Sequence, residues 1–294
     1  MFNKKEEKMR ISRLNLRYVV AGAACLAVSF FMFWSCGGGS SSKIKMTTEA
    51  GGEVSFYLAG SGVATVDWGD GSEKVLLTLN KRSVRFEHKY PSATIRTIII
   101  NGDNITGLTC VKKMTSLDVS RCTELTSLDY QGNQLASLDL SKNTALIKLT
   151  CGGRSYGDCT KLSSLDLSKN VAMTHLEVFS HELRDLDVSK NIALTHLKVG
   201  TVIIYLDVSK NIALRHLELP ASLVSLDVSQ NTKLEYLYVD SPNLSTEALN
   251  ALFGTLHSNT ISGREKIIQI GKTKGAGNRS IAREKGWVVK DRWG

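Results

Sequence analysis

Histidine and tyrosine side chains recur at one repeated position in the second half of the chain, each immediately before a leucine. Clustered imidazoles could bind a transition metal, or change charge together near their ordinary pKa of about 6.5. With tyrosines they could instead form a platform for a sugar ring or a partner's loop, and a plain solvated surface is the simplest account of them. We take both rows as a candidate partner-binding face. The first row is His175, His196, His216 and Tyr236, and the row two residues later is Glu177, Lys198, Glu218 and Tyr238.

Aspartates occupy a second repeated position, with lysines and serines close by. Carboxylates stacked at the strand spacing of about 4.8 Å would repel one another, although clustered carboxylate oxygens could also bind Ca²⁺. Calcium repeats bring several Asp and Gly together within each turn, which this pattern does not. It therefore favours a structural row neutralised by its neighbours, with no metal. The aspartates are Asp118, Asp139, Asp166, Asp187, Asp207 and Asp227, and the lysines are Lys142, Lys169, Lys190 and Lys210.

The spacing of the leucines predicts the elements that position these residues. Leu-Asp-Val or Leu-Asp-Leu begins at residues 117, 138, 165, 186, 206 and 226, at intervals of 21, 27, 21, 20 and 20. Such a period indicates a solenoid, in which each unit buries its apolar edge only against its neighbours. Because a leucine and the apolar residue two positions later share one side of a strand, we expect two narrow parallel sheets facing across an apolar core. Asn side chains at the Ser-Lys-Asn corners would satisfy backbone groups there.

The alternation of Leu-Asp-Val/Leu-Ser with a more varied Leu-x-Cys/Val/Leu resembles the short, nested class of leucine-rich repeat found in bacterial surface proteins, including the internalin kind. The resemblance covers residues 107–240 and is interrupted once, at Gly152–Asp158, which we interpret as a loop leaving one turn. It implies adhesion or protein-partner recognition by the solenoid face.

Four cysteines follow Cys36, and the repeat places them inside the solenoid. Cys110 and Cys151 take the inward position after a repeat leucine, while Cys122 and Cys159 take the slot that is otherwise Asn. A small apolar thiol suits both places. We therefore predict buried free thiols; an exported chain leaves a disulfide as an alternative, and the absence of a CxxC pair disfavours metal.

The first 35 residues have the features of an export signal, with a basic start followed by an uncharged apolar run of 17 residues, Tyr18–Trp34. The sequence Phe33-Trp34-Ser35-Cys36 resembles a bacterial lipoprotein signal, which implies lipidation of Cys36 and a membrane anchor. Because 17 residues is at the short limit for a bilayer span, a single-span anchor and ordinary cleavage remain alternatives. We expect an exported lipoprotein at the outer membrane or cell surface rather than a periplasm-facing one. Residues 36–42 would be a flexible Gly/Ser tether.

Residues 43–106 alternate in the manner of half-buried β-strands, and Val66-Asp67-Trp68-Gly69-Asp70-Gly71 is typical of a strand entering a tight turn. With His88-Lys89-Tyr90, this segment resembles the PKD domain, a small immunoglobulin-like β-sandwich. Asp70 and His88 could suggest a site, but bonding within the turn and corner accounts for them.

Residues 241–294 predict a small α/β cap for the C-terminal end of the solenoid. Ser245 is placed to cap a helix whose apolar stripe ends at Leu256. A strand at Lys266–Ile270, a short helix around Ser280–Lys285 and a strand at Trp287–Val289 would follow.

Charge and motifs exclude several classes of function. The chain has 37 basic and 28 acidic residues; without residues 1–35 it has 31 and 26, and residues 257–294 alone hold nine and three. The remainder is nearly neutral, which disfavours nucleic-acid binding. The basic tail could dock an anionic polymer or lipid headgroup, although a solvated tail explains it equally simply. His181-Glu182 lacks the second histidine of HExxH, and Gly271-Lys272-Thr273 lacks the upstream glycine of a P-loop.

We therefore predict a mostly β protein with a PKD-like sandwich, a leucine-rich-repeat solenoid and an α/β cap. Its function would be that of a non-catalytic, cofactor-free binding protein of the cell envelope with an unidentified protein partner. A cell-surface glycan-binding lipoprotein and an envelope scaffold without a soluble ligand are the alternatives.

Overall fold

The computed structural model describes residues 43–110, 113–152, 161–219, 221–261 and 263–291. The chain divides between Ser41 and Ser42 into two compact units, and the described buried core lies entirely in the second. The predicted export signal, Cys36, the predicted tether, Cys159 and most of the predicted loop at Gly152–Asp158 lie outside the described residues. None of the helices in the described ranges has both the length and the apolar character needed to cross a membrane.

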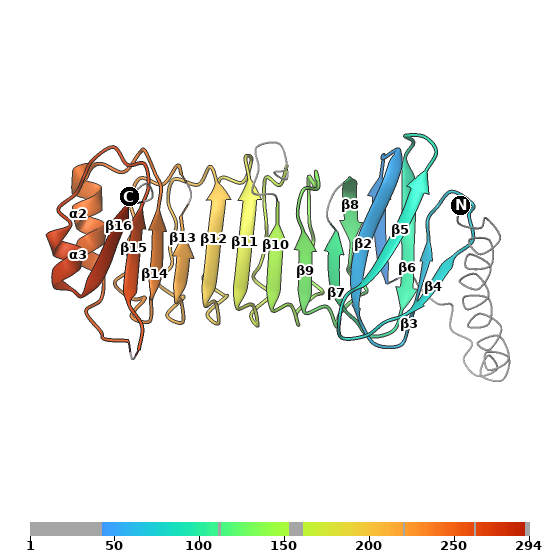
Figure 1. The fold of residues 1–294 in the computed structure, drawn as a ribbon, viewed down its shortest axis with the longest axis horizontal. Helices are drawn as coiled ribbons and strands as arrows, with labels where there is room; N and C mark the ends of the chain where they lie inside the picture. Colours follow the sequence, from blue (N-terminus) through green and yellow to red (C-terminus); the bar gives the residue numbers. More distant parts are fainter. Residues whose placement is uncertain (1–42, 111–112, 153–160, 220, 262, 292–294) are drawn as a thin grey trace, which may run out of the picture. The chain divides into compact units, whose positions relative to one another are not determined.

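One sheet of 11 strands runs through the described unit, in the order β16-β15-β14-β13-β12-β11-β10-β9-β7-β2-β5 (Figure 1). From β7 to β16 its strands are parallel. The repeat strands are β7 (Ile105–Cys110), β9 (Ser127–Tyr130), β10 (Lys148–Cys151), β11 (His175–Ser180), β12 (His196–Thr201), β13 (His216–Glu218) and β14 (Tyr236–Val239).

The repeat leucines lie directly opposite one another across this ladder. Leu149 is paired with Leu128 on one side and with Leu176 on the other, and Leu197, Leu217 and Leu237 continue the file. A slip of one residue would turn the leucines toward solvent, so burial of this file fixes the register. The interval of 27 residues leaves the ladder intact, because β10 pairs directly with β11. The described residues from β7 to β14 thus form a solenoid of leucine repeats.

The expected second parallel sheet is absent from the described residues, and this expectation is wrong. The Leu-Asp-Val segments from Leu138 onward form no strands, although their apolar side chains still point inward, with Leu186 only 5% and Val188 0% exposed. Their backbone groups are used locally instead. Ser189 N–H donates to Asp187 Oδ1 at 2.8 Å, and Asn191 N–H donates to the Val188 carbonyl at 3.0 Å. The second wall is therefore a stack of turns whose N–H groups are not available for a ladder.

Asparagine amides join successive turns at the corner. Asn191 is fully buried, and its Nδ2 donates to the Leu167 carbonyl at 3.1 Å and to the Asn170 carbonyl at 2.9 Å, both in the preceding turn. Cys122 takes this slot in an earlier turn, and its thiol donates to the Ile105 carbonyl at 3.3 Å. Cys110 and Cys122 are buried free thiols, as predicted, and Cys151 is buried as well. The same two bonds recur at Asn143, Asn170, Asn211 and Asn231.

The N-terminal β-region merges with the solenoid. A five-stranded antiparallel sheet has the order β4-β3-β6-β1-β8, while β2 and β5 extend the long sheet antiparallel to β7. Strand β7 therefore borders β2 in the long sheet, and strand β8 borders β1 in the five-stranded sheet. The bounds are β1 (Ile44–Thr48), β2 (Gly52–Gly60), β3 (Val63–Asp67), β4 (Val75–Thr78), β5 (Val84–Tyr90), β6 (Arg96–Gly102) and β8 (Met114–Asp118).

Asp70 and His88 form a bond between the turn after β3 and strand β5. His88 Nε2 lies 2.7 Å from Asp70 Oδ2, and the imidazole stacks on Trp68 with ring centroids 5.0 Å apart. Ser72 donates both its hydroxyl and its N–H to Asp70 Oδ1. The hydrogen bonds from Ser72 and His88 hold the pKa of Asp70 well below its ordinary value. Asp70 thus bonds both to Ser72 in its own turn and to His88 on β5. These contacts fit a structural role in the turn.

The C-terminal cap has the elements predicted for it. Helix α2 (Thr246–Thr255) begins after Ser245, whose Oγ accepts the Ala248 N–H at 3.2 Å. Strands β15 (Lys266–Ile270) and β16 (Trp287–Asp291) continue the parallel ladder, so the leucine file ends on Ile268 and Val289. The short helix α3 (Ser280–Glu284) lies beside α2, as Figure 1 shows at the end of the solenoid.

Replacing Asn191 with Ala should lower the free energy of unfolding by roughly 2 kcal/mol, because two buried carbonyl groups lose their donor. The buried Oδ1 of Asn191 has no partner within the described residues, so its removal offsets part of that loss. Denaturant titration measures the change. Lys190→Ala, at the exposed neighbouring position, is the control and should change stability little. Equal stability of the two variants would contradict a structural role for the amide.

Candidate functional site on the outward face of the sheet

The predicted histidine row is a continuous stack of rings across β11, β12, β13 and β14. Ring centroids are 4.3 Å apart for His175 and His196, 5.6 Å for His196 and His216, and 4.4 Å for His216 and Tyr236. The interplanar angles are 9°, 21° and 10°. The ladder register explains this row, because it sets the four residues opposite one another.

This stacking decides what the row can contact. His196 and His216 each have a ring neighbour on both faces, so they offer ring edges rather than flat faces to an incoming molecule. Nδ1 of His175 and of His196 is engaged by the hydroxyl of the preceding threonine, at 2.7 Å and 2.9 Å. A sugar ring that packs on an aromatic face would therefore find no free face on His196 or His216. No group of three or more potential metal ligands occurs among the residues described.

The second predicted row contains an ion pair in its centre. Lys198 Nζ contacts Glu218 Oε2, and His216 Nε2 lies 3.0 Å from Glu218 Oε1. Burial would raise the pKa of Glu218, but the hydrogen bonds from His216 and Lys198 outweigh it and lower the pKa to about 2. Glu177 and Tyr238 are half-buried on either side, in register with this pair. The row therefore presents fixed charges that compensate each other.

A third row, absent from the sequence prediction, forms a hollow with the second. Phe179 lies opposite Gly200, and a Cβ on Gly200 would come within 2.2 Å of the Phe179 ring. Glycine at this position thus lets the ring lie over β12. Asp240 accepts from Tyr238 OH at 2.9 Å and from Lys272 N–H at 2.6 Å.

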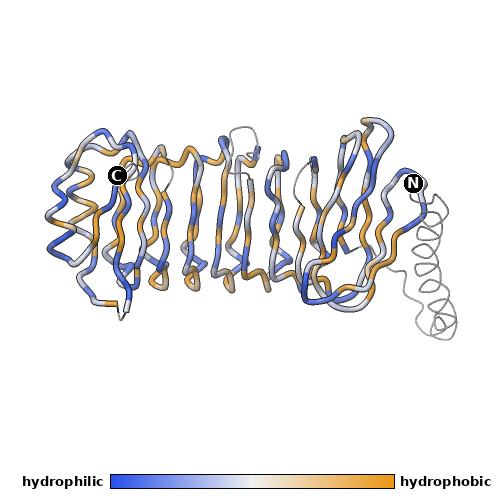
Figure 2. The backbone as a smooth tube through the Cα atoms, viewed as in Figure 1, coloured by the Kyte–Doolittle hydropathy of each residue, from blue (hydrophilic) through white to orange (hydrophobic). Residues whose placement is uncertain are grey.

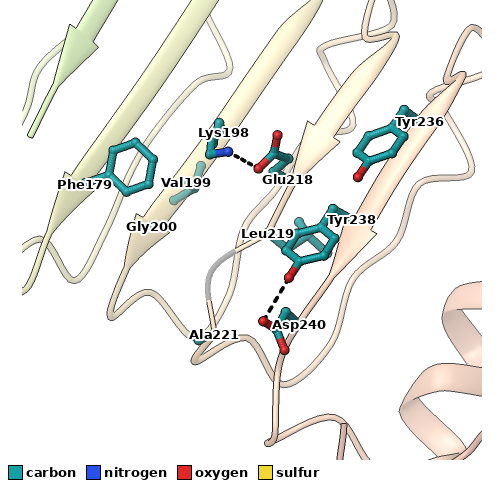
Figure 3. Close-up of a pocket in the computed structure, with 10 residues that line it drawn as sticks. All are labelled: Phe179, Lys198, Val199, Gly200, Glu218, Leu219, Ala221, Tyr236, Tyr238 and Asp240. Carbon is teal, nitrogen blue, oxygen red and sulfur yellow. Dashed lines mark hydrogen bonds and ion pairs between the residues drawn. The ribbon is translucent and has the colours of Figure 1, made fainter. Parts of the chain in front are cut away.

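The hollow has a volume of about 520 Å³. Figure 3 shows Phe179 on one side, Tyr236 and Tyr238 on the other, and the Lys198–Glu218 pair between them. Tyr236 OH donates to Gln269 Oε1 at 2.8 Å, which holds the ring upright at the edge. Four residues of the predicted face line the hollow: Lys198, Glu218, Tyr236 and Tyr238. The other four lie outside its lining: His175, His196, His216 and Glu177.

One sequence signal could have revealed the third row. Extending each predicted strand by two residues pairs Phe179 with Gly200, the combination in which an aromatic ring covers a glycine on a neighbouring strand. Asp240 lies one such step beyond Tyr238. The Leu-x-Val pattern ends before these positions, and for that reason it does not predict them.

The aspartate row lies on the opposite wall and is structural, as expected. Each carboxylate accepts the N–H of the serine two residues later, at 2.7–2.9 Å from Asp118 to Asp227. Hydrogen bonds from Ser168 lower the pKa of Asp166, and the same cause acts at Asp187 and Asp207. These bonds favour the ionised carboxylates, and Lys169, Lys190 and Lys210 add attraction through space.

Comparison with known proteins finds similarity among solved structures only. No protein-family model matches the chain, and no curated protein matches it. Among solved structures it is similar to the functional domain of InlJ from Listeria monocytogenes, which includes a cysteine ladder, with a TM-score of 0.45 and 26% identity over 64% of this chain. It is also similar to an LRR protein of Leptospira interrogans, with a TM-score of 0.44 and 14% identity over 58% of this chain. This chain spans 44% of each of those structures.

The histidine stack should make the protein less stable as the pH falls from about 7.5 to about 5.5, the range in which histidines titrate. Burial lowers the pKa of His175 and of His196, and Lys148 or the neighbouring histidines lower it further. The unfolded chain therefore takes up protons first, so stability is lost as the pH falls through the ordinary histidine pKa.

Denaturant midpoints at the two pH values measure this loss. The variant His175→Gln/His196→Gln should lose less on acidification than the wild type. His257, whose pKa burial also lowers, remains in both proteins and serves as an internal control. An equal loss in both would show that the stack does not contribute.

Proposed function

We propose that this chain is a non-catalytic binding protein of the cell envelope, which recognises a protein partner on the outward face of β11–β14. The observation that carries the proposal is the hollow of about 520 Å³ between Phe179 and the two tyrosines. It lies on a parallel ladder in strict register, so its walls are formed before a partner arrives. A preformed surface loses little conformational entropy on binding.

The chemistry of the lining supports a protein partner. Tyrosine and other aromatic residues carry much of the binding energy at protein interfaces, and they are most effective at the centre of a patch. The Lys198–Glu218 pair offers directed charge beside them, and the histidine ring edges continue the surface along the sheet.

A second candidate is a glycan, favoured by the three aromatic side chains among the charged residues of the hollow. A sugar in this hollow would depend on Phe179 and Tyr238, since Tyr236 already stacks on His216. An array of glycans, screened together with a panel of surface proteins, separates the two candidates. Failure of both screens would favour the scaffold.

Tyr236→Ala should weaken binding of a partner found in this screen by tenfold or more, as loss of an aromatic anchor at an interface does. Tyr205→Ala is the matched control, because Tyr205 is 65% exposed but lies on the wall of aspartates. Surface plasmon resonance of both variants measures the effect, with thermal melting to verify the fold. Equal binding of the two variants would place the partner elsewhere.

The envelope location is part of the same proposal. The basic start, the apolar run and Cys36 support export and a lipid anchor, with the β-region of residues 43–106 as a PKD-like spacer beyond the tether. These features favour the outer membrane or cell surface over a periplasm-facing position.

Protease treatment of intact cells should degrade the solenoid if it faces outward. Cys36→Ala should abolish incorporation of labelled fatty acid and release the protein from the membrane fraction. A protein that resists protease until the cells are lysed would contradict adhesion.

A further inference from the structure

A row of exposed apolar side chains follows the asparagine corner of the solenoid. The row consists of Val171, Ile192 and Ile212, whose side chains are 54%, 60% and 57% exposed. Each directly follows one of the corner asparagines. Single exposed apolar residues are ordinary, but these occupy one slot in successive turns, about 4.8 Å apart. Orange recurs along the edge where the strands β10 to β13 begin (Figure 2).

The repeat itself does not require an apolar residue in this slot. Thr144 and Thr232 occupy it in turns whose asparagines, Asn143 and Asn231, make the same two bonds to the preceding turn. Folding therefore tolerates threonine here. The apolar residues in the three intervening turns call for an explanation outside the fold.

A basic side chain lies two residues before this slot in five turns, while Gln230 takes that position in the turn of Thr232. These basic side chains are exposed, and none of them has a carboxylate within ion-pair distance in the described ranges. The aspartates of the adjoining wall lie three residues earlier and are engaged by serine N–H groups. Lys142, Lys169, Lys190 and Lys210 each lower the pKa of the aspartate three residues earlier through space. Because no close ion pair holds them in the described ranges, these exposed ammonium groups can also meet an external anion. These residues are Arg121, Lys142, Lys169, Lys190 and Lys210.

The size and charge of this edge identify the surface that it fits. Three side chains cover far less than the roughly 800 Å² that each partner buries in a stable protein interface. Two copies packed through this edge would also bring their basic rows close together. A bilayer needs neither a large patch nor shape complementarity, since shallow apolar side chains enter it while adjacent lysines meet anionic headgroups. We propose that this edge, from Arg121 to Ile212, docks on an anionic lipid bilayer.

The docking is independent of the sheet face and of the lipid anchor. Val171, Ile192 and Ile212 precede the strands, so an edge lying on a membrane leaves the hollow at the other end of β11–β14 open. Residues 42–294 contain the whole described core and can be tested without Cys36 and the apolar run before it.

Cosedimentation of residues 42–294 with lipid vesicles tests the proposal. The protein should bind vesicles of phosphatidylcholine mixed with phosphatidylglycerol, and bind phosphatidylcholine alone more weakly. Ile192→Thr/Ile212→Thr installs the residue that other turns carry, and should weaken binding about tenfold for each site. Lys169→Gln/Lys190→Gln should weaken binding only to the anionic vesicles, by about fivefold for each site.

Ile95→Thr is the matched control, because Ile95 is 72% exposed but lies in the N-terminal β-region. It should bind as the wild type does, and thermal melting should show all variants folded. Three outcomes overturn the proposal: no binding by the wild type, equal binding by Ile192→Thr/Ile212→Thr, or a dimer in analytical ultracentrifugation that this double variant dissociates. The last would assign the edge to a second copy of the chain.

Discussion

At five corners of the described solenoid, an asparagine amide donates to two carbonyl groups of the turn before it. A corner leaves these carbonyls buried and out of reach of any strand, and an unpaired buried carbonyl costs about 1–3 kcal/mol. The amide therefore ties each of these turns to its predecessor at a fixed height. Where Cys122 replaces asparagine, a thiol makes one weaker bond, and the N-terminal β-region packs at that end.

The height set at the corner fixes the register of the sheet, and the register converts repeated residues into columns. Inside, the column is leucine, and it continues from Leu108 to Val289 across nine strands. Outside, the same spacing forces imidazoles into ring-to-ring contact and brings Phe179 over Gly200. The register that makes the core continuous also fixes the outward surface. On that surface Lys198 pairs with Glu218, and the histidine rings stack on one another.

A stack of turns has two open ends, and strands extend the sheet at both of them, with helix α2 packed on the core at the C-terminal end. Strands β2 and β5 add antiparallel to β7, while β15 and β16 add parallel to β14. At each end an apolar cluster replaces the leucine file, with Phe56 and Trp68 near β7 and Phe253 and Trp287 near β16. Continuity of the ladder means that the N-terminal region, the solenoid and the cap share one hydrophobic core.

The sequence alone determined the stacked leucine file, the buried cysteines, the asparagine corners, the helix after Ser245 and the histidine row, because each follows from local spacing and side-chain type. It could not determine that the Leu-Asp-Val wall would lack strands, since Asp187 is equally able to face solvent or to accept the Ser189 N–H. It also could not show that the imidazoles cover one another's faces, or that Phe179, Gly200 and Asp240 complete a hollow. Those outcomes depend on distances between turns, which only the tertiary structure sets.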